Sequence, residues 1–170
     1  MIINSKYKIE KAVSKDETRD SLSQPTFERT GKTTGVLVAT DGRILAKVPV
    51  KVAPTDVEGY VPIEAIQLTR KNTHYAPLTL DKGGAHIQQR NGAKTTYLRM
   101  EGTFPNWKQL RPTAKKVTTI TFSPKRLLDL ARALGVENDG SLTLKIRKPG
   151  DAIEVINGDA DGLLMPMKTA

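Results

Sequence analysis

The chain has 170 residues and a formal net charge of +9, a value that favours a polyanionic partner such as nucleic acid but equally fits a basic surface without such a partner. The absence of cysteine excludes disulfides, thiolate-bound zinc and a cysteine nucleophile. No apolar run reaches the roughly 20 residues of a membrane-spanning helix and the first residues do not resemble a signal peptide, so we expect a cytoplasmic protein without a membrane partner.

Alternating apolar and polar residues dominate the chain and predict a protein rich in β-strands. Segments with this pattern lie at 7–14, 25–31, 34–42, 43–52, 77–83, 85–92, 95–102, 116–122, 141–148 and 151–158. The GKTTG stretch at 31–35 is predicted to be a hairpin turn and not a phosphate-binding loop, because the first glycine of the GxxxxGK[ST] motif is missing.

Two segments, 62–71 and 124–135, are predicted to be helices, and each begins with a proline at its first helical position. In the second helix, Gly135 supplies the stop. One face of it carries Leu127, Leu130, Ala131 and Leu134, and another carries Lys125, Asp129 and Arg132. The polar stretch 14–24 contains too many turn-forming residues for a long amphipathic helix.

The two predicted helices belong to an internal repeat of the form strand, helix, strand, strand, strand. One copy spans about 59–100 and the other about 116–167, with the segment 104–116 between them. Residues 1–52 fit a third, degenerate copy whose helix is missing. We therefore expect an α+β fold with mostly antiparallel sheets and two helices.

No constellation of residues in the sequence indicates catalysis. The two histidines, His74 and His86, do not have metal-ligand spacing and are expected on a loop and a strand. Predicted turns, where carboxylates commonly bind backbone amides, contain Asp16, Glu17, Asp20, Asp41, Asp159 and Asp161. We expect no enzymatic activity, no cofactor and no metal.

Three motifs, taken in their order along the chain, resemble the DNA sliding clamp family, specifically the beta subunit of bacterial DNA polymerase III. They are ETRDSLSQPTFER with VATDGRILA, then EGTFPNWKQLRP, then FSPKRLLDLARAL followed by GLLMPMK. The resemblance covers nearly the whole chain and implies a clamp fold built from repeated βαβββ units. Residues 1–112 resemble the middle domain of the family, with its first helix degenerate, and residues 113–170 resemble the C-terminal half of the last domain.

In this family, polymerases, the clamp loader and repair proteins dock short linear peptides into a hydrophobic pocket at the junction of the middle and last domains. Met side chains repack readily around peptides of different sequence, which suits such a role. From the pattern alone, the apolar run LLMPM also fits a buried edge strand without a ligand. The residues that match the pocket are Arg19, Leu22, Thr40, Gly42, Arg43, Leu45, Pro112, Leu163, Leu164, Met165, Pro166 and Met167.

Family clamps also close into rings whose basic helices hold double-stranded DNA through phosphate contacts. This chain resembles about three of the roughly twelve repeated units of a ring, so four copies give a tetrameric ring as a hypothesis. Ile63 and Glu64 replace residues that tend to be basic in the family, and a charged helical face is often only solvated. The candidates for DNA contact are Arg70, Lys71, Lys125, Arg126 and Arg132.

The leading hypothesis is a small clamp-like accessory protein, encoded by a phage or mobile element, that binds the clamp-binding peptides of DNA polymerase, the clamp loader or repair proteins. If it also encircles DNA, it acts as a processivity factor in DNA replication. The alternative is a truncated clamp mimic that sequesters clamp partners without forming a ring. A basic nucleic-acid-binding domain without a peptide pocket would need stacking aromatics on a sheet face, and the chain has one Trp, three Phe and four Tyr, with Trp107 expected to pack in the segment between the repeats.

Overall fold

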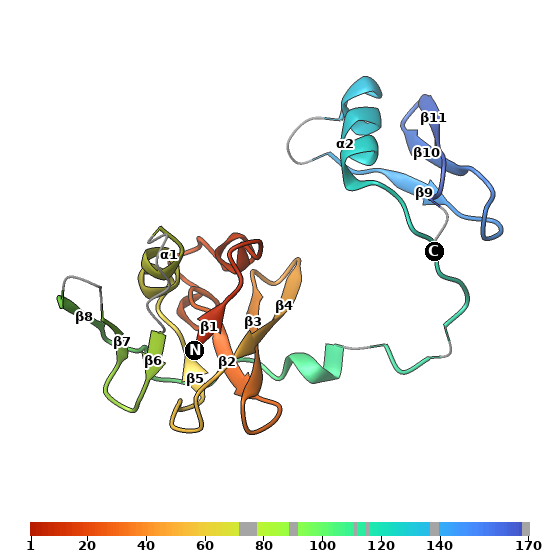
Figure 1. The fold of residues 1–170 in the computed structure, drawn as a ribbon. Coiled ribbons are helices and arrows are strands. Elements are labelled where there is room, and N and C mark those ends of the chain that lie inside the picture. The colour runs from red at the N-terminus through yellow and green to blue at the C-terminus, as the bar shows by residue number, and fades with distance from the viewer. Residues whose placement is uncertain (72–77, 89–91, 111, 115, 137–139, 168–170) are drawn as a thin grey trace. The chain divides into compact units, whose positions relative to one another are not determined.

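The computed structural model describes residues 1–71, 78–88, 92–110, 112–114, 116–136 and 140–167 (Figure 1). The side chains of Arg70 and Lys71 are not included in that description. The chain folds as two compact units, Met1–Leu110 and Arg111–Ala170, which we call the N-terminal and the C-terminal unit.

The N-terminal unit contains a five-stranded antiparallel sheet with the order β1-β4-β3-β2-β5. Its strands are β1 (Ile2–Ile3), β2 (Thr26–Arg29), β3 (Thr34–Thr40), β4 (Leu45–Lys51) and β5 (Gly59–Tyr60). A second sheet has the order β6-β7-β8 and consists of β6 (Leu78–Leu80), β7 (Ala85–Gln88) and β8 (Lys94–Tyr97). Short 3-10 helices span Ile9–Lys11, Asp20–Leu22 and Trp107–Leu110.

Helix α1 (Ile63–Lys71) follows β5 directly. Its N-terminus is capped from a distant part of the chain, because the backbone N–H of Ile63 donates to Gln24 Oε1 at 2.8 Å. Ala65 and Ile66 face the core and are fully buried. The helix thus joins the two sheets through a shared apolar centre.

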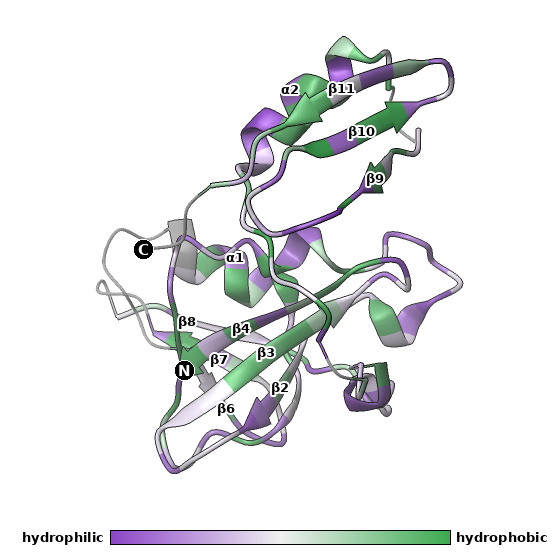
Figure 2. Ribbon diagram, turned by 90° about the vertical axis from the view of Figure 1, so that its right-hand side faces the viewer, coloured by the Kyte–Doolittle hydropathy of each residue, from purple (hydrophilic) through white to green (hydrophobic). Residues whose placement is uncertain are grey.

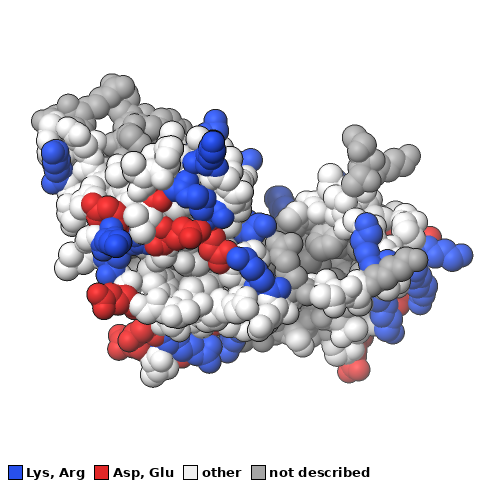
Figure 3. All heavy atoms as spheres, turned by 90° about the horizontal axis from the view of Figure 1, so that it is seen from below, with Lys and Arg blue, Asp and Glu red and all other residues white. Residues whose placement is uncertain are grey.

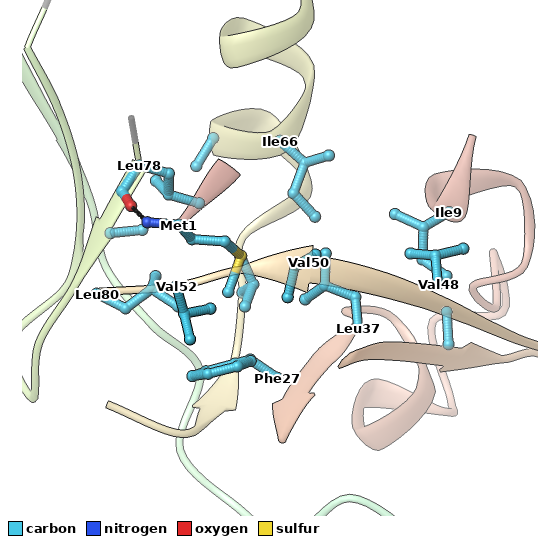
Figure 4. Packing of buried hydrophobic residues seen from close by; sticks show 14 of the residues in the cluster. Met1, Ile9, Phe27, Leu37, Val48, Val50, Val52, Ile66, Leu78 and Leu80 are labelled. Atoms are coloured by element: carbon cyan, nitrogen blue, oxygen red, sulfur yellow. Dashed lines mark hydrogen bonds between the residues drawn. The ribbon is translucent and has the colours of Figure 1, made fainter. Parts of the chain in front are cut away.

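The main core lies where side chains from one face of the large sheet meet α1 and the small sheet (Figure 4). Phe27, Leu37 and Val50 point to this side because alternate residues of a strand share one face. Figure 4 shows them packed with Ile66 of α1 and Leu80 of β6. On the opposite face of the sheet, the 3-10 helix at Trp107 covers a smaller apolar cluster with Val36, Val38 and Phe104.

The half-buried side chain of Arg99 and the buried side chain of Asp56 tie loops of the N-terminal unit together. Arg99 donates from Nε to the carbonyl of Tyr60 at 2.7 Å, from Nη1 to that of Asp81 at 2.8 Å and from Nη2 to that of Glu58 at 2.7 Å. Asp56 accepts hydrogen bonds from the backbone N–H groups of Leu80 and Ala53 and pairs with the Met1 ammonium group. Backbone groups between the sheets are therefore satisfied by side chains.

In the C-terminal unit, α2 (Pro124–Ala133) packs on a three-stranded antiparallel sheet of the order β11-β10-β9 (Figure 2). The strands are β9 (Thr143–Lys145), β10 (Ile153–Asn157) and β11 (Ala160–Leu164). Ser123 caps the helix, Pro124 is its first residue, and Gly135 follows it with φ of 76°, as the sequence predicts. Leu127, Leu130 and Leu134 pack on Ile153, Val155 and Leu164.

Most predicted elements are confirmed, including both helices, the hairpin turn at 31–35 and the antiparallel α+β class. Two predicted strands are wrong. Residues 7–14 contain a 3-10 helix whose Ile9 is buried in the core, and residues 116–122 form no strand, because their backbone makes no ladder with any described neighbour. In that segment Ile120 and Phe122 pack on the core of the unit, so the alternation of apolar residues reflects packing without strand pairing.

Candidate functional site

The hairpin between β3 and β4 is a closely bonded turn that carries several of the predicted peptide-binding residues. The Thr40 hydroxyl donates to the carbonyl of Ile44 at 2.6 Å and accepts from the N–H of Gly42 at 3.1 Å. Asp41 Oδ1 accepts from the N–H groups of Arg43 and Ile44, each at 2.8 Å. Gly42 has φ of 89°, a conformation that glycine adopts without strain. The turn therefore presents the side chains of Arg43 and Ile44 to solvent on a fixed backbone.

The carboxylates at this hairpin are held in their ionised form by their own neighbours. Hydrogen bonds from the N–H groups of Ile44 and Arg43 lower the pKa of Asp41. A hydrogen bond from the Thr18 hydroxyl, aided by the Thr18 N–H, lowers the pKa of Asp16. Both groups therefore carry negative charge at neutral pH.

Arg19 connects the hairpin to the preceding 3-10 helix. Its Nη1 donates to the carbonyl of Asp41 at 3.2 Å, and its Nε lies 3.4 Å from Asp16 Oδ2. Leu22 is half-buried, and its carbonyl accepts from the N–H of Ser14 at 2.9 Å. On β4, Leu45 is partly exposed. The six predicted residues of the N-terminal unit, Arg19, Leu22, Thr40, Gly42, Arg43 and Leu45, thus belong to one hairpin and the 3-10 segment bonded to it.

A cavity of about 300 Å³ opens beside this hairpin, and we call it the basic cavity. Lys11, Val13, Ser14, Lys15, Asp16, Arg19, Asp41 and Arg43 line it. Two of these residues, Arg19 and Arg43, were predicted to bind peptides. Lys11 and Lys15 are not among the predicted site residues, because Lys11 falls in the predicted strand 7–14 and Lys15 in the polar stretch 14–24.

The C-terminal unit contains an open apolar groove of about 530 Å³, which we call the methionine groove. Its lining consists of Thr119, Ile120, Thr121, Pro149, Gly150, Met165, Pro166 and Met167. Met165 is 58% exposed and Met167 is 49% exposed, although both are large apolar side chains. The structure thus brings the predicted residues Met165, Pro166 and Met167 together with the segment 119–121, which the sequence did not indicate as part of a binding site.

The two leucines before Met165 have opposite environments. Leu164 is only 3% exposed and packs with Ile153 and Val155, whereas Leu163 is 63% exposed on the other face of β11. Neither leucine lines the methionine groove, and Pro112, the remaining predicted residue, is exposed outside it. Leu164 therefore has a clear structural role within its own unit.

The predicted DNA-contacting residues lie on both helices. Arg70 and Lys71 form the last turn of α1, and their side chains are outside the described part of the structure. On α2, Lys125 Nζ lies 2.6 Å from Asp129 Oδ2, and this hydrogen bond lowers the pKa of Asp129. Arg126 and Arg132 are exposed. On the face of the N-terminal unit seen in Figure 3, acidic and basic side chains lie side by side.

His86 makes the only histidine contacts among the described residues. Its Nε2 lies 2.9 Å from Asp81 Oδ2 and its Nδ1 lies 2.9 Å from the Thr96 hydroxyl. Asp81 also accepts from the N–H groups of Gly83 and Gly84, so the cluster closes the turn between β6 and β7. His74 lies outside the described residues. No three His, Asp or Glu side chains in the described ranges are grouped as metal ligands, and no described helix is long and apolar enough to cross a membrane.

The fold matches solved structures of bacterial DNA polymerase III beta subunits. The beta chain of Streptococcus pneumoniae TIGR4 superimposes with a TM-score of 0.78 at 17% identity over 99% of this chain and 49% of the other. The chain has the DNA sliding-clamp fold. The Bartonella birtlesii clamp bound to griselimycin matches with a TM-score of 0.72 at 21% identity over 95% of this chain and 47% of the other. The Caulobacter crescentus beta clamp, with polyethylene glycol bound to a proposed beta-motif tethering region, matches with a TM-score of 0.73 at 21% identity over 94% of this chain and 46% of the other.

The clamp-like chain spans less than half the length of these clamps. No protein-family model matches its sequence, and no curated protein matches it significantly. The predicted resemblance to bacterial clamps and the predicted fold class are both confirmed by the structural matches.

Proposed function

We propose that this chain is a small sliding-clamp-like accessory protein that binds the clamp-binding peptides of replication and repair proteins. The observation that carries the proposal is the methionine groove, where Met165 and Met167 remain exposed beside Ile120. Exposed apolar side chains gathered in a groove are typical of binding surfaces, and methionine adapts its shape to different ligands. Met165 and Met167 are also among the residues for which the resemblance to the clamp family predicts a peptide pocket.

The residues of the β3–β4 hairpin in the N-terminal unit are also proposed to contact a clamp-binding peptide. Leu45 and Leu22 offer apolar contact, and Arg19 and Arg43 offer hydrogen-bond donors. The hydrogen bonds of the turn from Thr40 to Ile44 fix the backbone of Arg43, which lowers the entropy lost on binding. Two related clamps support ligand binding by this fold, since one is bound to griselimycin and another holds polyethylene glycol.

A second candidate function, competition with a resident clamp, is favoured by two features of the helices. The exposed side chains described on α1 include Glu64 and Gln67, neither of which is basic, and Lys125 of α2 is paired with Asp129. A chain that captures clamp-binding peptides without holding DNA would sequester the partners of a clamp. Ring formation, a processivity role and an origin in a phage or mobile element belong to the first candidate and remain proposals.

The test of peptide capture is a fluorescence-anisotropy titration of the folded chain into a fluorescein-labelled clamp-binding peptide of a bacterial replicative polymerase. A scrambled peptide of the same composition serves as the control. We expect saturable binding in the micromolar range, which corresponds to about 8 kcal/mol. Equal binding of the scrambled peptide, or no binding of either, would contradict the proposal.

Peptide capture alone does not separate the two candidates. Size-exclusion chromatography with light scattering measures whether several copies assemble, as a ring requires. A monomer that binds the peptide favours the competitor, whereas an assembly that retains circular DNA but releases linear DNA favours the processivity factor.

A further inference from the structure

The basic cavity of the N-terminal unit has more positive than negative charge in its lining. Four cationic side chains line it, but only two carboxylates, those of Asp16 and Asp41. Both carboxylates already accept hydrogen bonds from nearby donors, Asp16 from Thr18 and Asp41 from its own hairpin. The excess charge is therefore not cancelled within the cavity.

Two of the cations are without a partner in the part of the chain that the structure describes. The side-chain ammonium groups of Lys11 and Lys15 form no hydrogen bond or salt bridge with the described residues, and both side chains are exposed. Arg19 uses Nε and Nη1 to contact Asp16 and the Asp41 carbonyl, and its Nη2 donates to no described residue. The cavity thus offers several N–H donors to an incoming anion.

We propose that the basic cavity binds a carboxylate side chain, Asp or Glu, of the peptide that the chain captures. The inference rests on the proposed function and adds a sequence preference to it. Arg19 and Arg43 belong both to the cavity and to the residues proposed to contact the peptide, so a peptide held at the hairpin passes the mouth of the cavity. A charge-assisted hydrogen bond from guanidinium or ammonium groups to a carboxylate is the interaction that this lining favours.

The composition of the lining favours a single carboxylate over a nucleic-acid backbone. Asp16 and Asp41 lie among the cations and would repel a run of phosphates, whereas one carboxylate can approach the lysines with less opposition. The cations are exposed to solvent, so salt screens them. We expect the cavity to raise the affinity for a peptide with a suitably placed Asp or Glu by a few-fold, and not to provide most of the binding free energy.

The experiment compares three labelled peptides that share one clamp-binding sequence. Each carries two added residues before this sequence and two after it. The first peptide has Glu before and Gln after, the second has Gln before and Glu after, and the third has Gln at all four added positions. Each is titrated by fluorescence anisotropy against the wild type, the variant Lys11→Ala/Lys15→Ala and the variant Lys82→Ala/Lys94→Ala. The last variant removes the same charge from exposed positions that do not line the cavity.

We expect the wild type to bind one of the two Glu peptides about three- to tenfold more tightly than the Gln peptide at low salt. Lys11→Ala/Lys15→Ala should lose this preference and keep its affinity for the Gln peptide, and Lys82→Ala/Lys94→Ala should keep both. The inference is overturned if the wild type shows no preference for a Glu peptide, or if the two variants show the same preference. In either case, binding of the Gln peptide would still support the proposed function. If no peptide binds, the proposed function fails, and the inference fails with it.

A parallel titration with a 24-base-pair DNA duplex tests the competing use of the cavity. We expect the two double variants to bind the duplex equally, since they have the same net charge. A duplex affinity that is lower for Lys11→Ala/Lys15→Ala alone, without any loss of a Glu preference, would assign the cavity to phosphate and contradict the proposal.

Discussion

The backbone N–H of Met167 donates a hydrogen bond to the carbonyl oxygen of Thr121, with 2.7 Å between nitrogen and oxygen. This bond holds the end of the apolar run against the segment that forms another part of the methionine groove. Because Leu164 is fixed in the core a few residues earlier, Met165 and Met167 are held at the groove and exposed. Adjacent residues of one run therefore serve folding and, in our proposal, binding.

Replacing both groove methionines, Met165→Gln/Met167→Gln, should weaken peptide binding at least tenfold. A few apolar anchors carry most of the affinity of such sites, and glutamine preserves length while removing their apolar character. Both side chains are about half exposed, so the thermal midpoint should change little. Anisotropy and circular dichroism measure the two effects.

The matched control for this pair is Leu163→Gln, which also removes an exposed apolar side chain from the same run but does not line the groove. We expect it to retain wild-type peptide affinity. A double methionine variant that binds as tightly as the wild type would remove the groove from the proposed site.

Leu164→Ala should lower the free energy of unfolding of the C-terminal unit by about 2–5 kcal/mol, the usual cost of emptying a leucine site in a core. Its side chain contacts the cluster that α2 covers, and Gly162 of the same strand lies so close to α2 that an added Cβ would be 2.8 Å from Leu130 Cδ1. Leu163→Ala is the control and should change the stability by less than about 0.5 kcal/mol. Hydrogen exchange of the β10 and β11 amides reports the unit separately, and equal protection in the two variants would contradict the core assignment.

The sequence was most informative where local signals and packing agreed. In α2, the Pro at the start, the leucine face and Gly135 all indicate one helix, and the structure has it. Residues 116–122 show the opposite case, because their alternation reflects Ile120 and Phe122 packing on a core without a strand. A periodic pattern records which side chains are buried, but strand pairing depends on a neighbour that is distant in sequence.

The candidate site could be predicted only in part for the same reason. The resemblance to clamps pointed to Arg19, Arg43 and Met165 individually. It did not point to Lys11 or to Thr119, which join those residues only through the folded loops. It also could not separate Leu163 from Leu164, since the pairing of β11 with β10 decides which of them faces the core.

Arg99 should be important for the stability of the N-terminal unit. Its guanidinium donates to three backbone carbonyls, so Arg99→Ala leaves these acceptors without their donor and should cost about 2–4 kcal/mol. Arg99→Lys keeps the charge but not the planar fork and should cost less than Arg99→Ala. Urea denaturation measures both. A cost below about 1 kcal/mol for Arg99→Ala would show that water replaces the guanidinium at these carbonyls.

Asp56 should make the stability of the N-terminal unit depend on pH. Burial raises its pKa, but hydrogen bonds from the Leu80 N–H, the Met1 ammonium group and the Ala53 N–H outweigh burial, so its pKa in the folded chain is below the ordinary value. A lowered pKa means that Asp56 stabilises fully above its unfolded pKa of about 3.9, and that this contribution is lost as the pH falls through the folded value.

Asp56→Asn tests this dependence, because its amide cannot accept all of these bonds. The variant should be about 1–3 kcal/mol less stable than the wild type at pH 6, and the difference should shrink toward pH 3. Urea titrations at a series of pH values measure it. A difference that stays constant over this range would mean that the charge of Asp56 does not contribute.

The variant Lys125→Ala/Arg126→Ala/Arg132→Ala should weaken binding of a DNA duplex and flatten its salt dependence if α2 contacts phosphates. Each lost phosphate contact reduces the slope of log K against log salt by about 0.9, so a reduction of between one and three such steps is expected. All three side chains are exposed and alanine favours helix, so the fold should survive.

The control variant is Lys51→Ala/Lys82→Ala/Lys94→Ala, which removes the same charge from strands and a turn of the N-terminal unit. Its salt slope should stay closer to the wild-type slope. Equal slopes in the two triple variants would show that α2 makes no specific contribution to DNA binding, and with peptide capture intact that result would favour the competitor over the processivity factor.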